Sequence, residues 1–212
     1  KLLADHKIMK THDLLVGTEG WLSLVEQGPA PLYFKKEDFD KDDHLEIDRE
    51  TLEKYNLPLH PKPPQVRFFH MNEMGSLMSD NFEFETEIKN DFDEGSAACQ
   101  FVQVLIQCKD DVIIIPLSAK ACVGDLQVYA CGKGLSSKDT DLSALGCNLR
   151  EWNNLKVETK NKQMTIYVND REACSFTFPN AASGIVGVQY RFNGPGAVKS
   201  TKFKWANEEF EF

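Results

Sequence analysis

The residues best spaced for acid–base chemistry are three glutamates at every second position, Glu83, Glu85 and Glu87. In a strand they would share one face, with neighbours roughly 7 Å apart. Carboxylates about 5 to 10 Å apart can act as nucleophile or base and as general acid on a glycosidic bond. The same spacing is typical of the solvated outer face of a half-buried strand. We favour this second interpretation for two reasons. The central residue of the three, Glu85, is not the aspartate that a catalytic triplet of this spacing would carry, and the next residue at the same spacing is Lys89.

A second group of polar residues suits ligand binding better than catalysis. Three predicted strands carry them: Gln103 and Gln107, Gln127 and Tyr129, and Gln189 and Arg191. If these strands are neighbours, the side chains would line one face of a sheet and hydrogen-bond sugar hydroxyls. Tyr129 or Trp152 would supply an apolar platform. The alternative is that these residues face solvent or satisfy one another in the core.

A metal site has no specific support. Asp38, Asp40, Asp42 and Asp43 resemble the start of a calcium loop, but Asp43 replaces the glycine and Arg49 the glutamate that an EF-hand needs. We therefore expect a solvated acidic loop and no cofactor, with a looser calcium site as the alternative. The five histidines form no zinc-hydrolase motif, and neither a serine-hydrolase elbow nor a P-loop is present.

Composition narrows the possible partners. The 212 residues carry a net charge of −9 with a pI of about 5.1, which argues against nucleic acid and anionic membranes. No stretch approaches the ~20 apolar residues of a membrane span, so we expect no membrane insertion within the chain. Six cysteines allow fifteen pairings, among which the sequence does not choose. Most are expected to be small buried hydrophobes.

The element pattern predicts an all-β fold. From residue 151 to 205, four segments alternate apolar and polar residues and are separated by short turns such as Asn169-Asp170. We divide the chain into an N-terminal extension, residues 1–65, and a β-sandwich domain, residues 66–212. The extension is expected to be mostly irregular, with an edge strand near Trp21 and a short helix capped by Asp48.

Several short motifs carry a family resemblance: Trp152-Asn153, Ile166 to Asp170, Gly184 to Gly187 and Phe82 to Glu87. Together they resemble concanavalin-A-like (laminin-G-like) jelly-roll domains, and among these the bacterial 3-keto-disaccharide hydrolase type. The resemblance covers roughly residues 66 to 205 and implies a two-sheet antiparallel jelly roll. Asp170 stands where the family has glycine, and the N-terminal third does not match. Because the motifs are structural, they speak to fold rather than activity.

Three functions are compatible with these features. The first is a non-catalytic module of an exported bacterial protein that binds carbohydrate or a cell-surface partner. The second is a glycoside hydrolase that uses the three glutamates, and the third is an assembly domain that docks through its acidic N-terminal segment. Because the chain starts at Lys1 rather than Met, we expect a processed form. The expected location is extracytoplasmic, periplasmic or at the cell surface, where a segment before Lys1 could anchor it.

Overall fold

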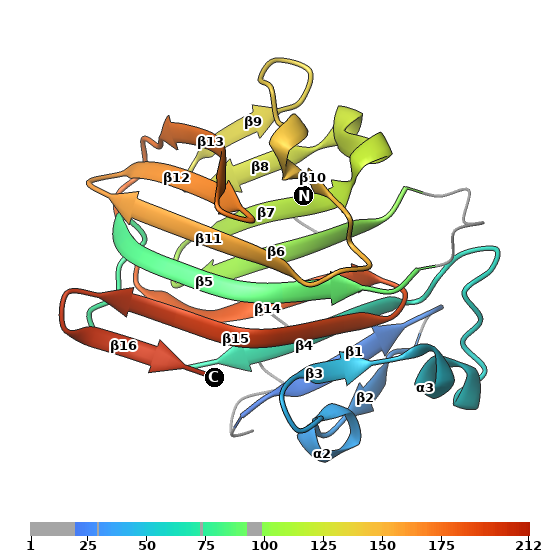
Figure 1. Ribbon diagram of the computed structural model, residues 1–212. Coiled ribbons are helices and arrows are strands. Elements are labelled where there is room, and N and C mark those ends of the chain that lie inside the picture. Colours follow the sequence, from blue (N-terminus) through green and yellow to red (C-terminus); the bar gives the residue numbers. More distant parts are fainter. Residues whose placement is uncertain (1–19, 29, 73, 93–98) are drawn as a thin grey trace.

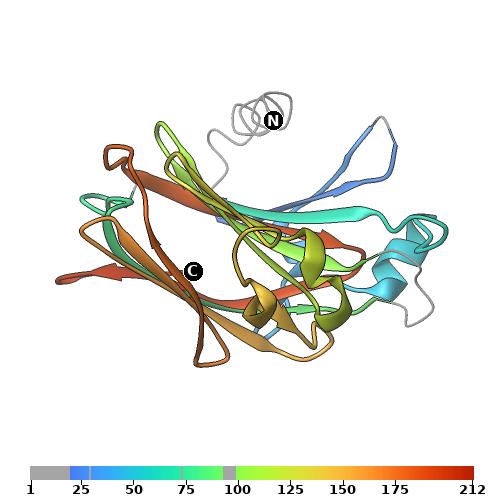
Figure 2. The same cartoon turned by 90° about the horizontal axis from the view of Figure 1, so that it is seen from above.

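The computed structural model describes residues 20–28, 30–72, 74–92 and 99–212. Its strands form two layers, seen from the front in Figure 1 and from above in Figure 2. Pairing is antiparallel in both layers except for one short parallel pair, β7 (Val112–Ala119) with β10 (Gly146–Cys147). The predicted two-sheet antiparallel sandwich is therefore confirmed.

The first layer, sheet A, has nine strands in the order β2-β1-β4-β14-β6-β7-β8-β9, with β10 beside β7. Besides β7 and β10, its strands are β1 (Leu22–Glu26), β2 (Leu32–Phe34), β4 (Gln65–Met71), β6 (Phe101–Cys108), β8 (Gln127–Ala130), β9 (Lys133–Ser136) and β14 (Ile185–Asn193). A strand does form beside Trp21, but it lies one place in from the edge, because β2 pairs with its outer side.

The second layer, sheet B, has seven strands in the order β13-β12-β11-β5-β15-β16, with β3 beside β15. Its strands are β3 (Leu45–Ile47), β5 (Asn81–Asn90), β11 (Asn153–Lys160), β12 (Gln163–Val168), β13 (Arg171–Thr177), β15 (Gly196–Trp205) and β16 (Glu208–Glu211). The helical segments are α2 (Lys36–Phe39), α3 (Arg49–Lys54), η1 (Lys120–Asp125) and η2 (Ser143–Leu145). No helix among the described residues has the length and apolar character needed to cross a membrane.

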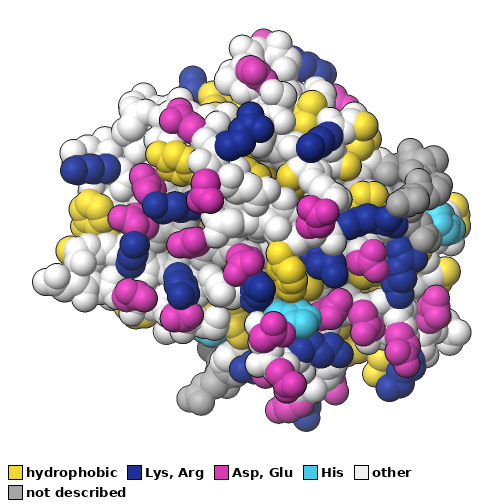
Figure 3. All heavy atoms as spheres, in the orientation of Figure 1, with side chains coloured by type: hydrophobic (Ala, Val, Ile, Leu, Met, Phe, Trp, Pro, Cys, Tyr) yellow, Lys and Arg dark blue, Asp and Glu magenta, His cyan; other side chains and the backbone are white. Residues whose placement is uncertain are grey.

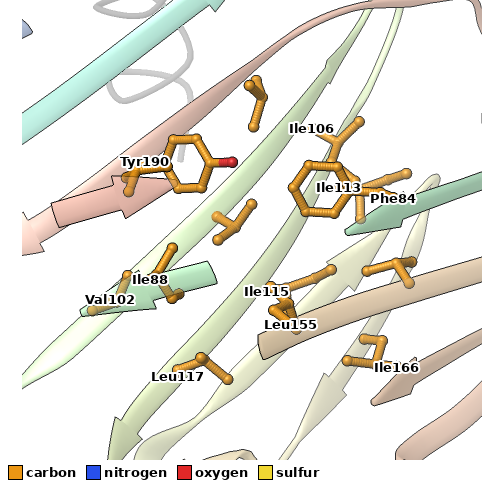
Figure 4. Packing of buried hydrophobic residues seen from close by; sticks show 14 of the residues in the cluster. Phe84, Ile88, Val102, Ile106, Ile113, Ile115, Leu117, Leu155, Ile166 and Tyr190 are labelled. Carbon is orange, nitrogen blue, oxygen red and sulfur yellow. The ribbon is translucent and has the colours of Figure 1, made fainter. Parts of the chain in front are cut away.

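The core lies between the sheets because each strand turns every second side chain inward. In β11, Leu155 and Val157 are fully buried while Lys156 and Glu158 are partly exposed, as predicted. Figure 4 shows side chains of both layers meeting in this space. The phenol of Tyr190, which lies there, donates a hydrogen bond to the Thr86 hydroxyl at 2.8 Å. Its polar end is thereby satisfied inside an apolar core.

The turn predicted at Asn169-Asp170 and the helix cap predicted at Asp48 are both present. Asn169 and Asp170 both have positive φ, 49° and 62°, which is the geometry of a tight hairpin turn. The Asp48 carboxylate accepts a hydrogen bond from the Thr51 amide at 2.8 Å and caps α3. One disulfide joins Cys99 to Cys122. The remaining cysteines are buried thiols: Cys108, Cys131, Cys147 and Cys174.

Candidate functional site

Six of the predicted ligand-binding residues lie on one surface, the face of sheet A that points away from sheet B. The inward positions of its strands are filled by core residues such as Val104 and Tyr190, so the alternate positions point outward. We call this surface the amide face. Its predicted members are Gln103, Gln107, Gln127, Tyr129, Gln189 and Arg191.

Strand order brings four of these six residues together. β14 and β6 are direct neighbours, and Arg191 is opposite Gln103 in their register. Gln189 is opposite Leu105. Two residues further along the same two strands, Gln107 is opposite Gly187. Opposite residues on adjacent strands have Cβ atoms about 5 Å apart. The amides and the guanidinium are therefore close enough to contact one small ligand.

The other two members lie further across the sheet. β7 separates β8 from β6, and Tyr129 is opposite Ile114 of β7. The Tyr129 hydroxyl accepts a hydrogen bond from the Gly132 amide at 3.2 Å. Gln127 is exposed, whereas Tyr129 is half-buried. This pair extends the amide face by two strands toward the β8–β9 hairpin.

The sequence interpretation missed three residues of the amide face: Arg67, Glu26 and Gln65. Arg67 of β4 is opposite Arg191 of β14, and it lies beside β1 on its other side. Its guanidinium donates to the Glu26 carboxylate at 2.7 Å and to the Gln65 side-chain oxygen at 2.9 Å. Burial lowers the pKa of Arg67, although the Glu26 charge opposes that shift. One sequence signal could have identified Gln65 and Arg67 as members of this face. They alternate with the apolar residues Val66 and Phe68 in the same strand.

Two glutamines of this face hold polar atoms that need a partner. Gln189 is 0% exposed, and neither its amide nitrogen nor its side-chain oxygen has a hydrogen-bond partner among the described residues. The buried amide nitrogen of Gln107 likewise has none in this part of the chain. A buried polar group left unsatisfied costs about 1–3 kcal/mol. These atoms are therefore both buried and unpartnered, at the centre of the sheet face.

Apolar side chains lie among these polar groups. Leu24 and Phe69 form a small cluster of their own with Leu22, separate from the core between the sheets. Leu105 is fully buried at the centre of the face, and Ile114 is half-buried beside it. Hydrogen-bonding groups on the amide face thus lie next to apolar side chains, of which Leu22 and Ile114 are partly exposed and Leu24, Phe69 and Leu105 are buried.

Trp152, the seventh predicted binding residue, lies elsewhere. It immediately precedes β11 of sheet B, where its ring makes an edge contact with His44 at 5.5 Å. The Lys199 ammonium lies 4.7 Å from the Trp152 ring centroid, a cation–π contact. The structure therefore does not bring Trp152 to the amide face.

The three glutamates lie on the outer face of sheet B among lysines. Glu83 pairs with Lys204 at 2.9 Å and Glu87 with Lys199 at 3.5 Å. Glu85 accepts a hydrogen bond from the Asn154 amide at 2.8 Å. Figure 3 views this face and shows basic and acidic side chains intermixed across it. This is the arrangement of a solvated face, and a catalytic role for the three glutamates stays a prediction.

The acidic segment and the described histidines were the places where the sequence left a metal site open. Within the described residues, no three His, Cys, Asp or Glu side chains are placed to hold a metal ion. Asp38 instead accepts a hydrogen bond from the Lys35 amide at 3.0 Å, and Asp40 pairs with Lys36 at 3.3 Å. His44 contacts the carboxylates of its neighbours Asp43 and Glu46. His6 and His12 lie outside the described residues.

No family model matches this chain, and no curated protein matches it either. Among solved structures, an alginate lyase from Corynebacterium sp. is 11% identical with a TM-score of 0.48, covering 88% of this chain and 94% of that one. The carbohydrate binding module CBM66 from Bacillus subtilis is 12% identical with a TM-score of 0.43, covering 66% and 86%. The Caenorhabditis elegans galectin LEC-6 is 9% identical with a TM-score of 0.37, covering 62% and 95%. Because these TM-scores are below 0.5, the similarities do not bear on what this chain binds.

Proposed function

We propose that this chain is a non-catalytic carbohydrate-binding module of an exported bacterial protein, and that the amide face is its binding site. The observation that supports this most directly is the gathering of Gln103, Gln107, Gln189 and Arg191 on two adjacent strands. Side-chain amides both donate to and accept from hydroxyl groups, which a sugar presents in pairs. The amides of Gln189 and Gln107, buried and without partners among the described residues, lie beside the more exposed Gln103.

The apolar part of the face fits the same ligand. A pyranose ring has apolar C–H faces as well as hydroxyls, so a site for it needs apolar and polar surface side by side. Leu22 and Ile114, both partly exposed, would supply the first, and Gln103 and Gln127 the second. On the outer face of sheet B, by contrast, Glu83 and Glu87 are paired with lysines.

Export is supported by the disulfide between Cys99 and Cys122. Disulfides form and persist in oxidising compartments such as the periplasm or the cell surface. An extracytoplasmic module would also meet polysaccharides there. We therefore include a periplasmic or cell-surface location in the proposal, together with a cell-surface glycan as the natural partner.

Calorimetric titration against a panel of oligosaccharides tests the binding proposal. We expect at least one oligosaccharide to bind, and the variants Gln127→Ala, Tyr129→Ala and Arg191→Ala to weaken its binding. The matched control is Lys204→Ala on sheet B, which should leave affinity unchanged. If no oligosaccharide binds, or if the three variants bind as the parent protein does, the proposal is wrong.

A further inference from the structure

The register of sheet A places five residues of the amide face in one row across five strands. Each residue is opposite the next in the pairing of β1, β4, β14, β6 and β7. We call them the central row: Leu22, Phe69, Gln189, Leu105 and Ile114. All but the glutamine are apolar, although the row points away from the core between the sheets. Sheet A is therefore apolar on both of its faces along this row.

The middle of the central row is closed to solvent. Phe69 is 4% exposed, and Gln189 and Leu105 are both 0% exposed. Where the outer face of an antiparallel sheet meets water, its side chains stay accessible, as the lysines and glutamates of β11 do. The ends of the row, Leu22 and Ile114, are partly exposed. The row is therefore covered, and its middle more completely than its ends.

The described residues do not supply this cover. Leu105 belongs to neither of the two apolar clusters that they form. Within the same described part of the chain, the cluster of Leu24 and Phe69 gains only Leu22. The helical segments pack instead against the core between the sheets, through Phe39 of α2, Leu52 of α3, Val123 of η1 and Leu145 of η2. Because these exposures are those of one chain by itself, the cover belongs to the same chain.

Residues 1–19 have the place in the chain, the length and the composition that the cover needs. They end at Gly20, whose φ of 85° permits a sharp turn, and Leu22 is the first residue of the central row. From β1 to β7 the row crosses four strand spacings, about 19 Å. Nineteen residues span about 28 Å even when wound as a helix.

Composition also favours residues 1–19 over residues 93–98. The first segment carries large apolar side chains at Leu2, Leu3, Ile8, Met9, Leu14, Leu15 and Val16. The second reads Asp-Glu-Gly-Ser-Ala-Ala and has no large apolar side chain. Burying an apolar row requires apolar surface on the covering segment, which only the first of the two can provide.

We infer that residues 1–19 lie along the central row as an autoinhibitory cover, which a saccharide must displace to reach Gln189 and Gln107. The cover itself stands on the burial of the row, whereas the competition rests on the proposed carbohydrate-binding function. A covering segment also brings backbone amides and carbonyls to the Gln189 side chain. Both polar atoms of that side chain lack a partner among the described residues.

Hydrogen exchange followed by mass spectrometry tests whether the segment is held. In the full chain, residues 1–19 should exchange at least about tenfold more slowly than in a synthetic peptide of the same sequence. The double variant Leu14→Glu, Leu15→Glu places charges on the segment alone, so it should raise the exchange rate toward that of the peptide. Ile114→Glu should do the same from the sheet side. Tyr167→Glu, at a partly exposed outward position of β12 in sheet B, is the matched control and should change nothing.

Calorimetric titration tests the competition in the same proteins. The double variant should bind a saccharide about tenfold more tightly than the parent chain, because the free energy of displacing the segment is removed. Tyr167→Glu should bind as the parent does. Unchanged circular dichroism confirms that each variant is folded.

The outcomes separate the cover from the proposed function. If residues 1–19 exchange as the free peptide does, or if their protection survives the changes at Leu14, Leu15 and Ile114, the inference is overturned. Protection that appears only at high protein concentration, with dimers in light scattering, would identify a second copy as the cover and also overturn it. If the segment is released but affinity does not rise, the competition is overturned and the proposed function stands. If neither parent nor released variant binds any oligosaccharide of the panel, the proposed function fails while the cover stands.

Discussion

Across β5, β11 and β15, lysines and glutamates stand opposite one another, as Glu85 does between Lys156 and Lys202. On the other layer, β4, β14 and β6 carry arginines, amides and apolar side chains at the equivalent outward positions. Both layers obey the same inward alternation. The difference lies in what each outward face leaves unsatisfied. Sheet B neutralises its own charges, whereas sheet A holds buried amides without partners among the described residues.

The comparison teaches that exposure alone does not mark a binding face. The side chains of sheet B are the more accessible, yet Glu83 and Glu87 already have lysine partners. The amide face is the more buried of the two, with Arg67 only 8% exposed. A surface whose polar groups are desolvated but incompletely paired gains more from a ligand than a solvated one does. Each prediction below tests one part of this contrast.

The largest expected effect concerns the inward residues, where the two sheets should behave alike. Phe68 of sheet A and Phe84 of sheet B are both fully buried in one shared core. Replacing either with Ala should lower the free energy of unfolding by about 3–5 kcal/mol, from lost apolar burial and the cavity left behind. Urea denaturation measures the change.

Lys160→Ala is the exposed control and should change stability by less than about 0.5 kcal/mol. If one variant loses much less unfolding free energy than the other, its sheet contributes little to the shared core. The difference between the two outer faces would then follow from a difference in how firmly the two sheets are packed.

The second prediction contrasts histidines from the two layers. Burial, with a smaller contribution from Lys36, lowers the pKa of His70 to about 4. The folded protein therefore binds this proton less well than the unfolded chain, so stability is lost as pH falls below about 6.5. We expect roughly 1–2 kcal/mol to be lost between pH 7 and pH 5. His70→Phe, which keeps a ring stacked on Phe212, should remove this loss.

His44, beside sheet B, should show the opposite sign. Partial burial opposes its charge, but hydrogen bonds to Glu46 and Asp43 raise the pKa of His44 above its ordinary value. Its contribution is present at low pH and is lost as pH rises through the raised pKa. His44→Gln should therefore destabilise the protein more at pH 5 than at pH 8. Thermal unfolding across this range would contradict the interpretation if both variants shifted in the same direction.

The third prediction separates stability from binding on the amide face. Gln189→Met replaces an unpartnered buried amide with an apolar side chain of similar length. Because the cost of the unsatisfied amide disappears, the unfolding free energy of the protein without ligand should rise by about 1 kcal/mol. Saccharide affinity should fall by about tenfold, since hydrogen bonds to the ligand are lost.

The matched control is Gln163→Met on the outer face of sheet B. The Gln163 amide donates to the Ser175 hydroxyl at 2.7 Å in an exposed position. This change should alter stability by less than about 0.5 kcal/mol and leave binding intact. A loss of stability in Gln189→Met would show that the amide is satisfied in solution, contrary to the role given to it here.

Periodicity predicted the layers well, because the inward positions of long strands follow the period of two. Leu155 and Val157 are inside as expected, and β15 keeps its pairing with β5 across a register shift between Lys199 and Lys202. Short elements were harder. The stretch from residue 132 to 146 contains β9 and η2, which have too few residues to show a period.

The candidate site was predictable residue by residue but not as an assembled surface. Alternation put Gln189 and Arg191 on one face, while only the register places Gln103 opposite Arg191. Trp152 was grouped with them because it is aromatic and near a strand. That strand belongs to the other sheet, and the sequence holds no signal for which layer a strand joins. Cysteine pairing is likewise set by long-range contacts.

The smallest expected effect concerns the lysine–glutamate pairs of sheet B. A double-mutant cycle on Lys204→Ala and Glu83→Ala should give a coupling of about 0.2–1 kcal/mol, falling with added salt, since both side chains are substantially solvated. The triple variant Glu83→Gln, Glu85→Gln and Glu87→Gln should bind saccharides as the parent does. It also tests the hydrolase alternative on the same panel of oligosaccharides. If the parent protein cleaves any of them and the triple variant does not, the carboxylates of sheet B are catalytic. The functional contrast between the two faces would then be reversed.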